Sequence, residues 1–229
     1  MATALQQKFE KLYTKRNRGG LRLLPLYLQD WISRITDKEF KKAAGSRYVL
    51  LNCIPANSNG AEVGVWKGDF SEKILRFRDP QRLYLIDPWQ FDEGIVTIGA
   101  RHGLPPGINM EKVDDGAGIE NIYHYVAKRF ANQNNVQIMR HTSVDAAAKI
   151  QDASLDWAYI DGDHSYQAVA QDLRAWHPKI KSGGVLCGDD YYWRDAGNEL
   201  SIKRAVDEFL GTISYRYFFV YRSQFVIGL

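Results

Sequence analysis

The sequence predicts an α/β fold with a mostly parallel sheet, helices on both faces and an antiparallel hairpin at the C-terminus. Several short runs are apolar throughout instead of alternating with polar residues, which is typical of strands buried on both faces. Amphipathic stretches separate these runs, and the repeated strand and helix order predicts parallel strands joined by crossover helices. The length of 229 residues suits one domain with decorations.

The chain opens with two predicted helices, roughly residues 4–14 and 25–44, which Gly19 and Gly20 separate. We expect residues 1–47 to be an N-terminal helical extension that acts as a lid or an oligomer contact. This segment holds 11 Lys and Arg against 4 Asp and Glu, whereas the rest of the chain is net acidic. Its basic surface could meet an anionic substrate, nucleic acid or lipid headgroups, or it could be a solvated helical face.

Residues 48–229 form the predicted main domain. The predicted strands are GAEVGVW (60–66), RLYLIDPW (82–89), VQIMR (136–140), LDWAYIDGD (155–163) and GGVLCGDDY (183–191). Helices are expected over 70–76, 118–133, 144–150, 166–177 and 201–210. Two β-rich runs within 213–229 predict a hairpin at the sheet edge. Residues 91–117, with five glycines and two adjacent prolines, predict a loop insertion that is a lid, a binding segment or disordered.

Composition excludes several classes of protein. No apolar run reaches the roughly 18 to 20 residues of a membrane helix, and the N-terminus is too polar for a signal peptide. We therefore expect a cytoplasmic protein with no membrane span. Cys53 and Cys187 lie in apolar runs without a second Cys or a His at a zinc-ligand spacing, so neither a disulfide nor a zinc site is expected.

Glycine and carboxylate residues follow the first two predicted strands. Gly64 and Gly68 permit a tight turn that a flat ligand can approach, and Asp87 lies where an acidic side chain can bind both hydroxyls of a ribose. The third glycine of a dinucleotide motif is missing, and Glu62 would repel a phosphate but attract an ammonium group. S-adenosylmethionine (SAM) has a ribose, an ammonium and a sulfonium and no phosphate. An ordinary strand-to-helix turn is the alternative.

Carboxylates follow two further strands directly. Asp161 and Asp163 come after WAYI, and Asp189 and Asp190 come after VLCG. If these strands are parallel neighbours about 4.8 Å apart, the carboxylates converge on one small volume. Carboxylates gathered without a nearby Arg or Lys repel one another, so we expect protonation or a bound cation, and an oxygen-only set suits Mg²⁺. Alternatively, Asp163 and Asp190 simply cap the elements that follow them.

These residues resemble a known family. The segments Asp161-Gly162-Asp163-His164-Ser165-Tyr166, Trp176–Lys179, Lys181–Leu186 and Asp189–Tyr191, with Gly64–Gly68, look like class I SAM-dependent methyltransferases. The group related to macrocin-type sugar O-methyltransferases is the most similar. The resemblance covers roughly residues 60–90 and 136–192. It implies a Rossmann-like class I methyltransferase fold and methyl transfer to a hydroxyl of a small molecule, a sugar or glycoside.

The resemblance also implies roles for matching positions. Glu62, Gly64 and Gly68 would hold the methionine end of SAM, and Asp87 the ribose. The adenine edge would lie near the cofactor-binding residues Thr142 and Ser143, with Asp161 also beside the cofactor. A divalent cation, Mg²⁺, would be bound by Asp161, Asp189 and Asp190. Asp163 would be the general base. His164 stands where the sugar-methylating pattern has an apolar residue, so it is a second candidate base, unless it makes only a structural hydrogen bond.

Two other functions remain open at this stage. One is a nicotinamide-dependent oxidoreductase on a related fold, against which the missing third glycine argues. The other is a non-catalytic SAM-binding or scaffold protein that docks a partner through its basic N-terminal region. The expected partner is a small hydroxylated acceptor, with no nucleic acid, and the N-terminal helices could form a homo-oligomer.

Overall fold

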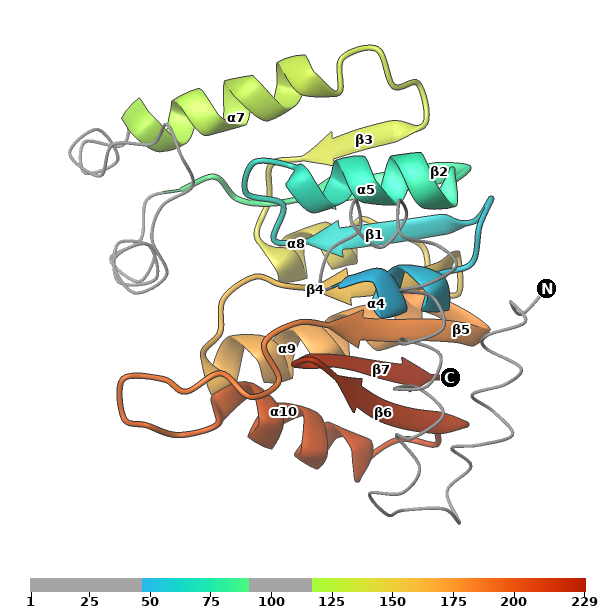
Figure 1. The fold of residues 1–229 in the computed structure, drawn as a ribbon, viewed down its shortest axis with the longest axis vertical. Helices are drawn as coiled ribbons and strands as arrows, with labels where there is room; N and C mark the ends of the chain where they lie inside the picture. Colours follow the sequence, from blue (N-terminus) through green and yellow to red (C-terminus); the bar gives the residue numbers. More distant parts are fainter. Residues whose placement is uncertain (1–46, 91–116) are drawn as a thin grey trace, which may run out of the picture.

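The structure is a computed structural model that describes residues 47–90 and 117–229 (Figure 1). The predicted helices at 4–14 and 25–44, with the basic surface expected on them, lie outside the described residues. So does the predicted insertion up to residue 116.

Seven strands form one twisted sheet in the order β3-β2-β1-β4-β5-β7-β6 (Figure 1). Five strands are parallel to one another, whereas β7 pairs antiparallel with both β5 and β6. This confirms the predicted parallel sheet and the C-terminal hairpin at its edge. The strand bounds are β1 Asn59–Val63, β2 Arg82–Ile86, β3 Val136–Met139, β4 Leu155–Ile160, β5 Ile180–Gly188, β6 Tyr217–Tyr221 and β7 Gln224–Gly228.

The five predicted helices of the main domain are present within a few residues of their expected ends. They are α5 Asp69–Arg78, α7 Ala117–Arg129, α8 Ser143–Ala148, α9 Tyr166–Trp176 and α10 Ser201–Leu210, and the short turn η4 His177–Lys179 follows α9. One described helix, α4 Tyr48–Cys53, was not predicted. Its sequence YVLLNC is a six-residue apolar run, and so short a run carries no readable helical period.

The helices cover both faces of the sheet and produce two hydrophobic cores (Figure 1). Helices α4, α5 and α7 pack on the face that presents Leu83, Trp157 and Cys187, whereas α8, α9 and α10 pack on the face that presents Ala61 and Leu186. Residues alternate between the faces along each strand because successive side chains point to opposite sides. Cys53 and Cys187 are buried and free, as predicted.

The register brings the carboxyl ends of the central strands to one level. Val63 pairs with Ile160 and with Ile86, and Ile160 pairs with Gly188. The residues that come next, Gly64, Asp87, Asp161 and Asp189, therefore share one edge of the sheet. Strand order reverses between β1 and β4, which is where open α/β sheets bind ligands. Among the described residues, no helix has both the length and the apolar character needed to cross a bilayer.

Candidate active site

The turn from β1 into α5 depends on two glycines with left-handed backbone. Gly64 has φ 88° and Gly68, the N-cap of α5, has φ 77°. A Cβ on Gly64 would lie 2.0 Å from the backbone oxygen of Asp161, and a Cβ on Gly68 would lie 2.5 Å from the Phe130 ring. The absence of side chains therefore lets the turn lie directly against the loop that follows β4.

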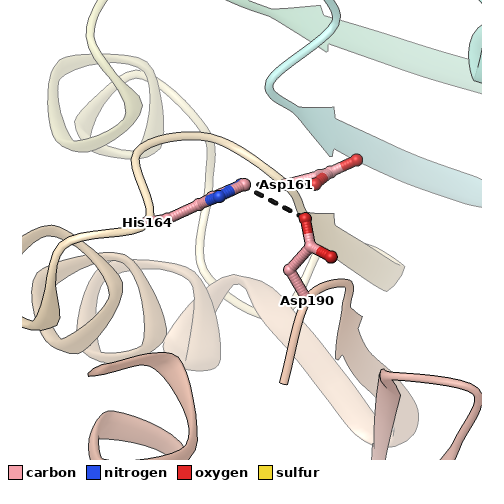
Figure 2. A group of neighbouring side chains, drawn as sticks. All are labelled: Asp161, His164 and Asp190. Atoms are coloured by element: carbon pink, nitrogen blue, oxygen red, sulfur yellow. Dashed lines mark ion pairs between the residues drawn. The ribbon is translucent and has the colours of Figure 1, made fainter. Parts of the chain in front are cut away.

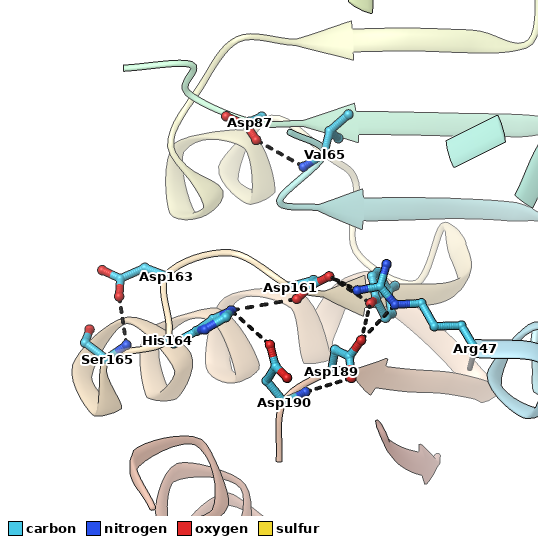
Figure 3. Close-up of polar contacts among 10 residues, drawn as sticks. Arg47, Val65, Asp87, Asp161, Asp163, His164, Ser165, Asp189 and Asp190 are labelled. Atoms are coloured by element: carbon cyan, nitrogen blue, oxygen red, sulfur yellow. Dashed lines mark hydrogen bonds and ion pairs between the residues drawn. The ribbon is translucent and has the colours of Figure 1, made fainter. Parts of the chain in front are cut away.

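Asp87, at the end of β2, organises this turn through its carboxylate. Its Oδ2 accepts hydrogen bonds from the backbone N–H groups of Val65 (3.1 Å) and Trp66 (2.9 Å). Its Oδ1 accepts from the N–H of Trp89 at 2.8 Å. Burial raises the pKa of Asp87, and the three backbone donors act in the opposite direction. In this arrangement Asp87 fixes the backbone beside the site predicted for the ribose (Figure 3).

Glu62 lies inside the domain beneath the same turn. It is buried, and its Oε2 has no hydrogen-bond partner among the described residues. Burial raises the pKa of Glu62 to about 8, although the Ser71 hydroxyl and the Arg47 charge lower it. A buried carboxyl with an unsatisfied oxygen is a group that a bound cation can stabilise.

Asp161 and Asp189 share an arginine that the sequence did not indicate (Figure 3). Arg47 donates from Nη2 to Asp161 Oδ2 and from Nε to Asp189 Oδ2, both at 2.7 Å. The hydroxyl of Tyr159 donates to the same oxygen of Asp161 at 2.9 Å. The two carboxylates therefore do converge, as predicted, but the expectation that no Lys or Arg lies close to them was wrong.

His164 lies on the side of Asp161 opposite Arg47 (Figure 3), and its ring points toward Asp161 and Asp190 (Figure 2). Its Nε2 is 3.7 Å from Asp161 Oδ1 and 3.7 Å from Asp190 Oδ2. Burial alone would lower the pKa of His164, but the neighbouring carboxylates of Asp161 and Asp190 outweigh it and raise the pKa. Burial and the charge of Asp189 raise the pKa of Asp190. The imidazole edge packs against Trp193, with 5.0 Å between ring centroids.

Asp163, the other candidate base, points away from this cluster (Figure 3). It is exposed, and its Oδ1 accepts a hydrogen bond from the backbone N–H of Ser165 at 2.7 Å. Ser165 is the N-cap of α9. In this structure Asp163 thus holds the loop that leads into the helix, which was the alternative explanation for this residue.

Thr142 and Ser143, predicted near the adenine, both have local partners. Thr142 caps α8, accepting from the backbone N–H of Asp145 at 3.3 Å and donating to its carboxylate at 2.7 Å. Ser143 Oγ accepts from the indole N–H of Trp176 at 2.8 Å. Ser143 also lowers the pKa of buried Asp172, which burial raises to about 6. Both hydroxyls follow β3, at the same sheet edge as Asp87.

A family model described as a methyltransferase domain matches residues 61–191. The chain belongs to this methyltransferase family. Methyl transfer is the activity that gives this family its name. An Aeropyrum pernix fibrillarin, which was solved with natively bound SAM, superimposes with a TM-score of 0.48 and 11% identity, covering 76% of this chain and 66% of that one.

Individual relatives of this chain are distant. An uncharacterized protein of Sinorhizobium fredii, y4gI, is 35% identical over 117 residues, which cover 50% of this chain and 10% of that protein. The chain thus spans about a tenth of the length of this curated relative. A Corynebacterium glutamicum structural genomics target superimposes with a TM-score of 0.53 and 14% identity, covering 88% of this chain and 95% of that one. The O-methyltransferase NovP has a TM-score of 0.49 and 19% identity, covering 86% and 79%.

The residues around the β1–α5 turn fit a methyl donor of this kind. Beneath this turn, Glu62 offers an unsatisfied buried carboxyl to a cationic ligand. When bound, SAM supplies a methyl group on a positively charged sulfur.

The three carboxylates predicted to bind Mg²⁺ fit a metal site less well than the β1–α5 turn fits SAM. Two of its three predicted ligands, Asp161 and Asp189, already bind the Arg47 guanidinium through their Oδ2 atoms. The donors that lie within 4.8 Å of one another among the described residues are those of Asp161, His164 and Asp190. That mixed nitrogen and oxygen set differs from the oxygen ligands that Mg²⁺ prefers. The magnesium site stays a prediction, and no catalytic step is assigned to it.

The Gly64→Ala variant should lose both stability and SAM affinity. The left-handed φ costs an alanine roughly 1 to 2 kcal/mol, and the new Cβ would meet backbone, which cannot rotate away. The matched control is Gly162→Ala, whose Cβ would meet only Val63 Cγ1 at 4.0 Å. Thermal unfolding and SAM calorimetry compare the two. Equal behaviour of both variants would contradict the close approach of the turn to Asp161.

Proposed function

We propose that this methyltransferase transfers the SAM methyl group to a hydroxyl of a small molecule, a sugar or glycoside, with His164 as the general base. The observation that carries this proposal is the position of the His164 imidazole. It lies at the carboxyl edge of the central strands, between Asp161 and Asp190. The sugar class comes from the resemblance of the Asp161–Tyr166 motif and of Asp189–Asp190.

The reaction is an in-line displacement in which the acceptor oxygen attacks the methyl carbon and the carbon–sulfur bond breaks. Holding three atoms close to collinear can supply much of the acceleration. The turn held by Asp87 and Gly64 would bind the donor on the β1 side of the switch point. The acceptor would lie on the β4–β5 side, next to His164. The base must take the acceptor proton as the new bond forms, and His164 Nε2 can accept it when the imidazole is neutral.

Asp161 and Asp190 would stabilise the protonated form of the imidazole after the transfer, because both carboxylates lie 3.7 Å from Nε2. Tyr192, which is 56% exposed, and Trp193 lie two and three positions after Asp190 and would offer aromatic surface to an acceptor ring. Tyr191 and Tyr166, by contrast, have structural partners: Tyr191 is buried and donates to Asp207 at 2.6 Å, and Tyr166 donates to Glu208.

The test measures SAM binding by calorimetry and then methyl transfer to a panel of sugars, glycosides and phenols, with and without EDTA. We expect SAM binding and EDTA-insensitive methylation of a hydroxyl. Failure to bind SAM would reject the proposal. Binding without transfer to any acceptor would favour a non-catalytic SAM-binding protein. Activity that EDTA abolishes and Mg²⁺ or Mn²⁺ restores would return the metal to the mechanism and make His164 a ligand.

A further inference from the structure

Arg47 enters the site from outside the part of the chain that matches the methyltransferase family. It lies immediately before α4, whereas the family match begins at residue 61. Its side chain nevertheless reaches the strand ends and forms two 2.7 Å hydrogen bonds, one to Asp161 and one to Asp189. These are charge-assisted bonds at the short end of their usual range.

The guanidinium is held on its faces as well as on its edges. Its central carbon lies 4.9 Å from the Phe70 ring centroid and 5.6 Å from that of Tyr159. Its side chain is 28% exposed, and those of Asp161 and Asp189 are 15% and 11% exposed. Burial opposes its charge, but the neighbouring carboxylates of Asp161 and Asp189 outweigh burial and raise the pKa of Arg47. The two carboxylates therefore share one permanent cation, which offsets part of their charge in a mostly desolvated position.

A divalent ion bound by Asp161 and Asp189 would need the carboxylate oxygens that already bind Arg47. Each carboxylate directs its Oδ2 at Arg47, and the remaining oxygen of Asp189 accepts from the backbone N–H of Asp190 at 2.8 Å. Two positive charges cannot share these two oxygens without strong repulsion. We infer that Arg47 is the resident cation of this site: it takes the position between Asp161 and Asp189 that an oxygen-bound divalent ion would occupy.

Arg47 is then a positioning residue for the reaction, a role that rests on the proposed function. Its bond to Asp161 Oδ2, together with the Tyr159 hydroxyl, fixes that carboxylate with Oδ1 facing His164 Nε2. The cation assignment itself can be tested without any activity, because it predicts how the protein binds a metal ion.

The experiment titrates Mn²⁺ into the full chain and follows free Mn²⁺ by electron paramagnetic resonance. We expect Arg47→Met to bind Mn²⁺ about tenfold or more tightly than the wild type, since its removal leaves two adjacent carboxylates without a counter-ion. Arg47→Lys keeps a positive charge and should stay close to the wild type. Adding Asp189→Asn to Arg47→Met should abolish the gain, because it removes one of the two freed carboxylates. A merely structural role of Arg47 would not produce this pattern.

Arg47→Met affinity within about twofold of the wild type, with circular dichroism unchanged, would overturn the inference. So would anomalous density for Mn²⁺ between Asp161 and Asp189 in soaked wild-type crystals with Arg47 displaced, a measurement that stands even if Arg47→Met does not fold. SAM binding by the wild type is measured in parallel. If SAM does not bind, the proposed function fails, while the Mn²⁺ titration still decides the assignment of Arg47.

Discussion

Replacing His164 with Gln is expected to lower kcat for methyl transfer by roughly 10²- to 10⁴-fold, the usual contribution of a general base. Glutamine keeps a polar side chain of similar reach but cannot accept the acceptor proton. The Kd for SAM should change little, because His164 lies on the β4–β5 side of the edge and the glycine turn follows β1. Initial rates at saturating SAM, with a methylated acceptor from the panel, give kcat.

Asp163→Asn provides the matched comparison for the base. An asparagine oxygen can still accept the Ser165 N–H, so the entry to α9 is kept while the ability to take a proton is lost. We expect this variant to retain most of the wild-type kcat. A large loss in Asp163→Asn and a small one in His164→Gln would assign the base to Asp163 and would mean that the loop rearranges when substrates bind.

Sequence patterns sufficed to predict that the carboxylates at the strand ends meet, because neighbouring parallel strands end at the same level. Ile160 and Gly188 are paired residues of β4 and β5, so the residues that follow them, Asp161 and Asp189, must be neighbours. Tyr159 could also have been found, since it precedes Asp161 by two positions and lies on the same face of β4. The sheet and its hairpin follow equally from local apolar runs.

Arg47 could not have been found in this way. It is 114 residues from Asp161 and 142 from Asp189 along the chain, and its place depends on how α4 docks. A single arginine at the end of a basic segment gives no local sign of this contact. The choice between Asp163 and His164 likewise needed side-chain directions, because both residues sit in the same short loop after β4.

Glu62 should give the protein a pH-dependent stability that Glu62→Gln removes. Its pKa is about 8 in the folded protein, against an ordinary value of 4.5. Between these two pH values the folded state holds a proton that the unfolded chain has released. Stability is therefore fully present below about pH 4.5 and is lost as the pH rises through about 8. Glutamine resembles the protonated carboxyl and does not ionise.

The difference in unfolding free energy between the wild type and Glu62→Gln reports on Glu62 alone, because Asp172 and Asp87 titrate in both proteins. At 1.36 kcal/mol per pKa unit, the shift allows Glu62→Gln up to roughly 5 kcal/mol more stability than the wild type near pH 9 and almost none near pH 4.5. Urea unfolding across this range measures it. Parallel curves for the two proteins would show that Glu62 is already ionised when no ligand is bound.

SAM affinity should depend on pH in the direction opposite to stability, and the same carboxyl of Glu62 is the cause. A cationic SAM beside Glu62 favours its ionised form, so binding should release a proton near neutral pH, and affinity should rise from pH 6 to pH 9. Calorimetry in buffers of different ionisation enthalpy detects the proton directly. Glu62→Gln should bind SAM more weakly, release no proton at this group and lose the rise with pH. The buried carboxyl would then be a cost to the empty protein that the bound methyl donor offsets, which explains why an unsatisfied acid lies beneath the glycine turn.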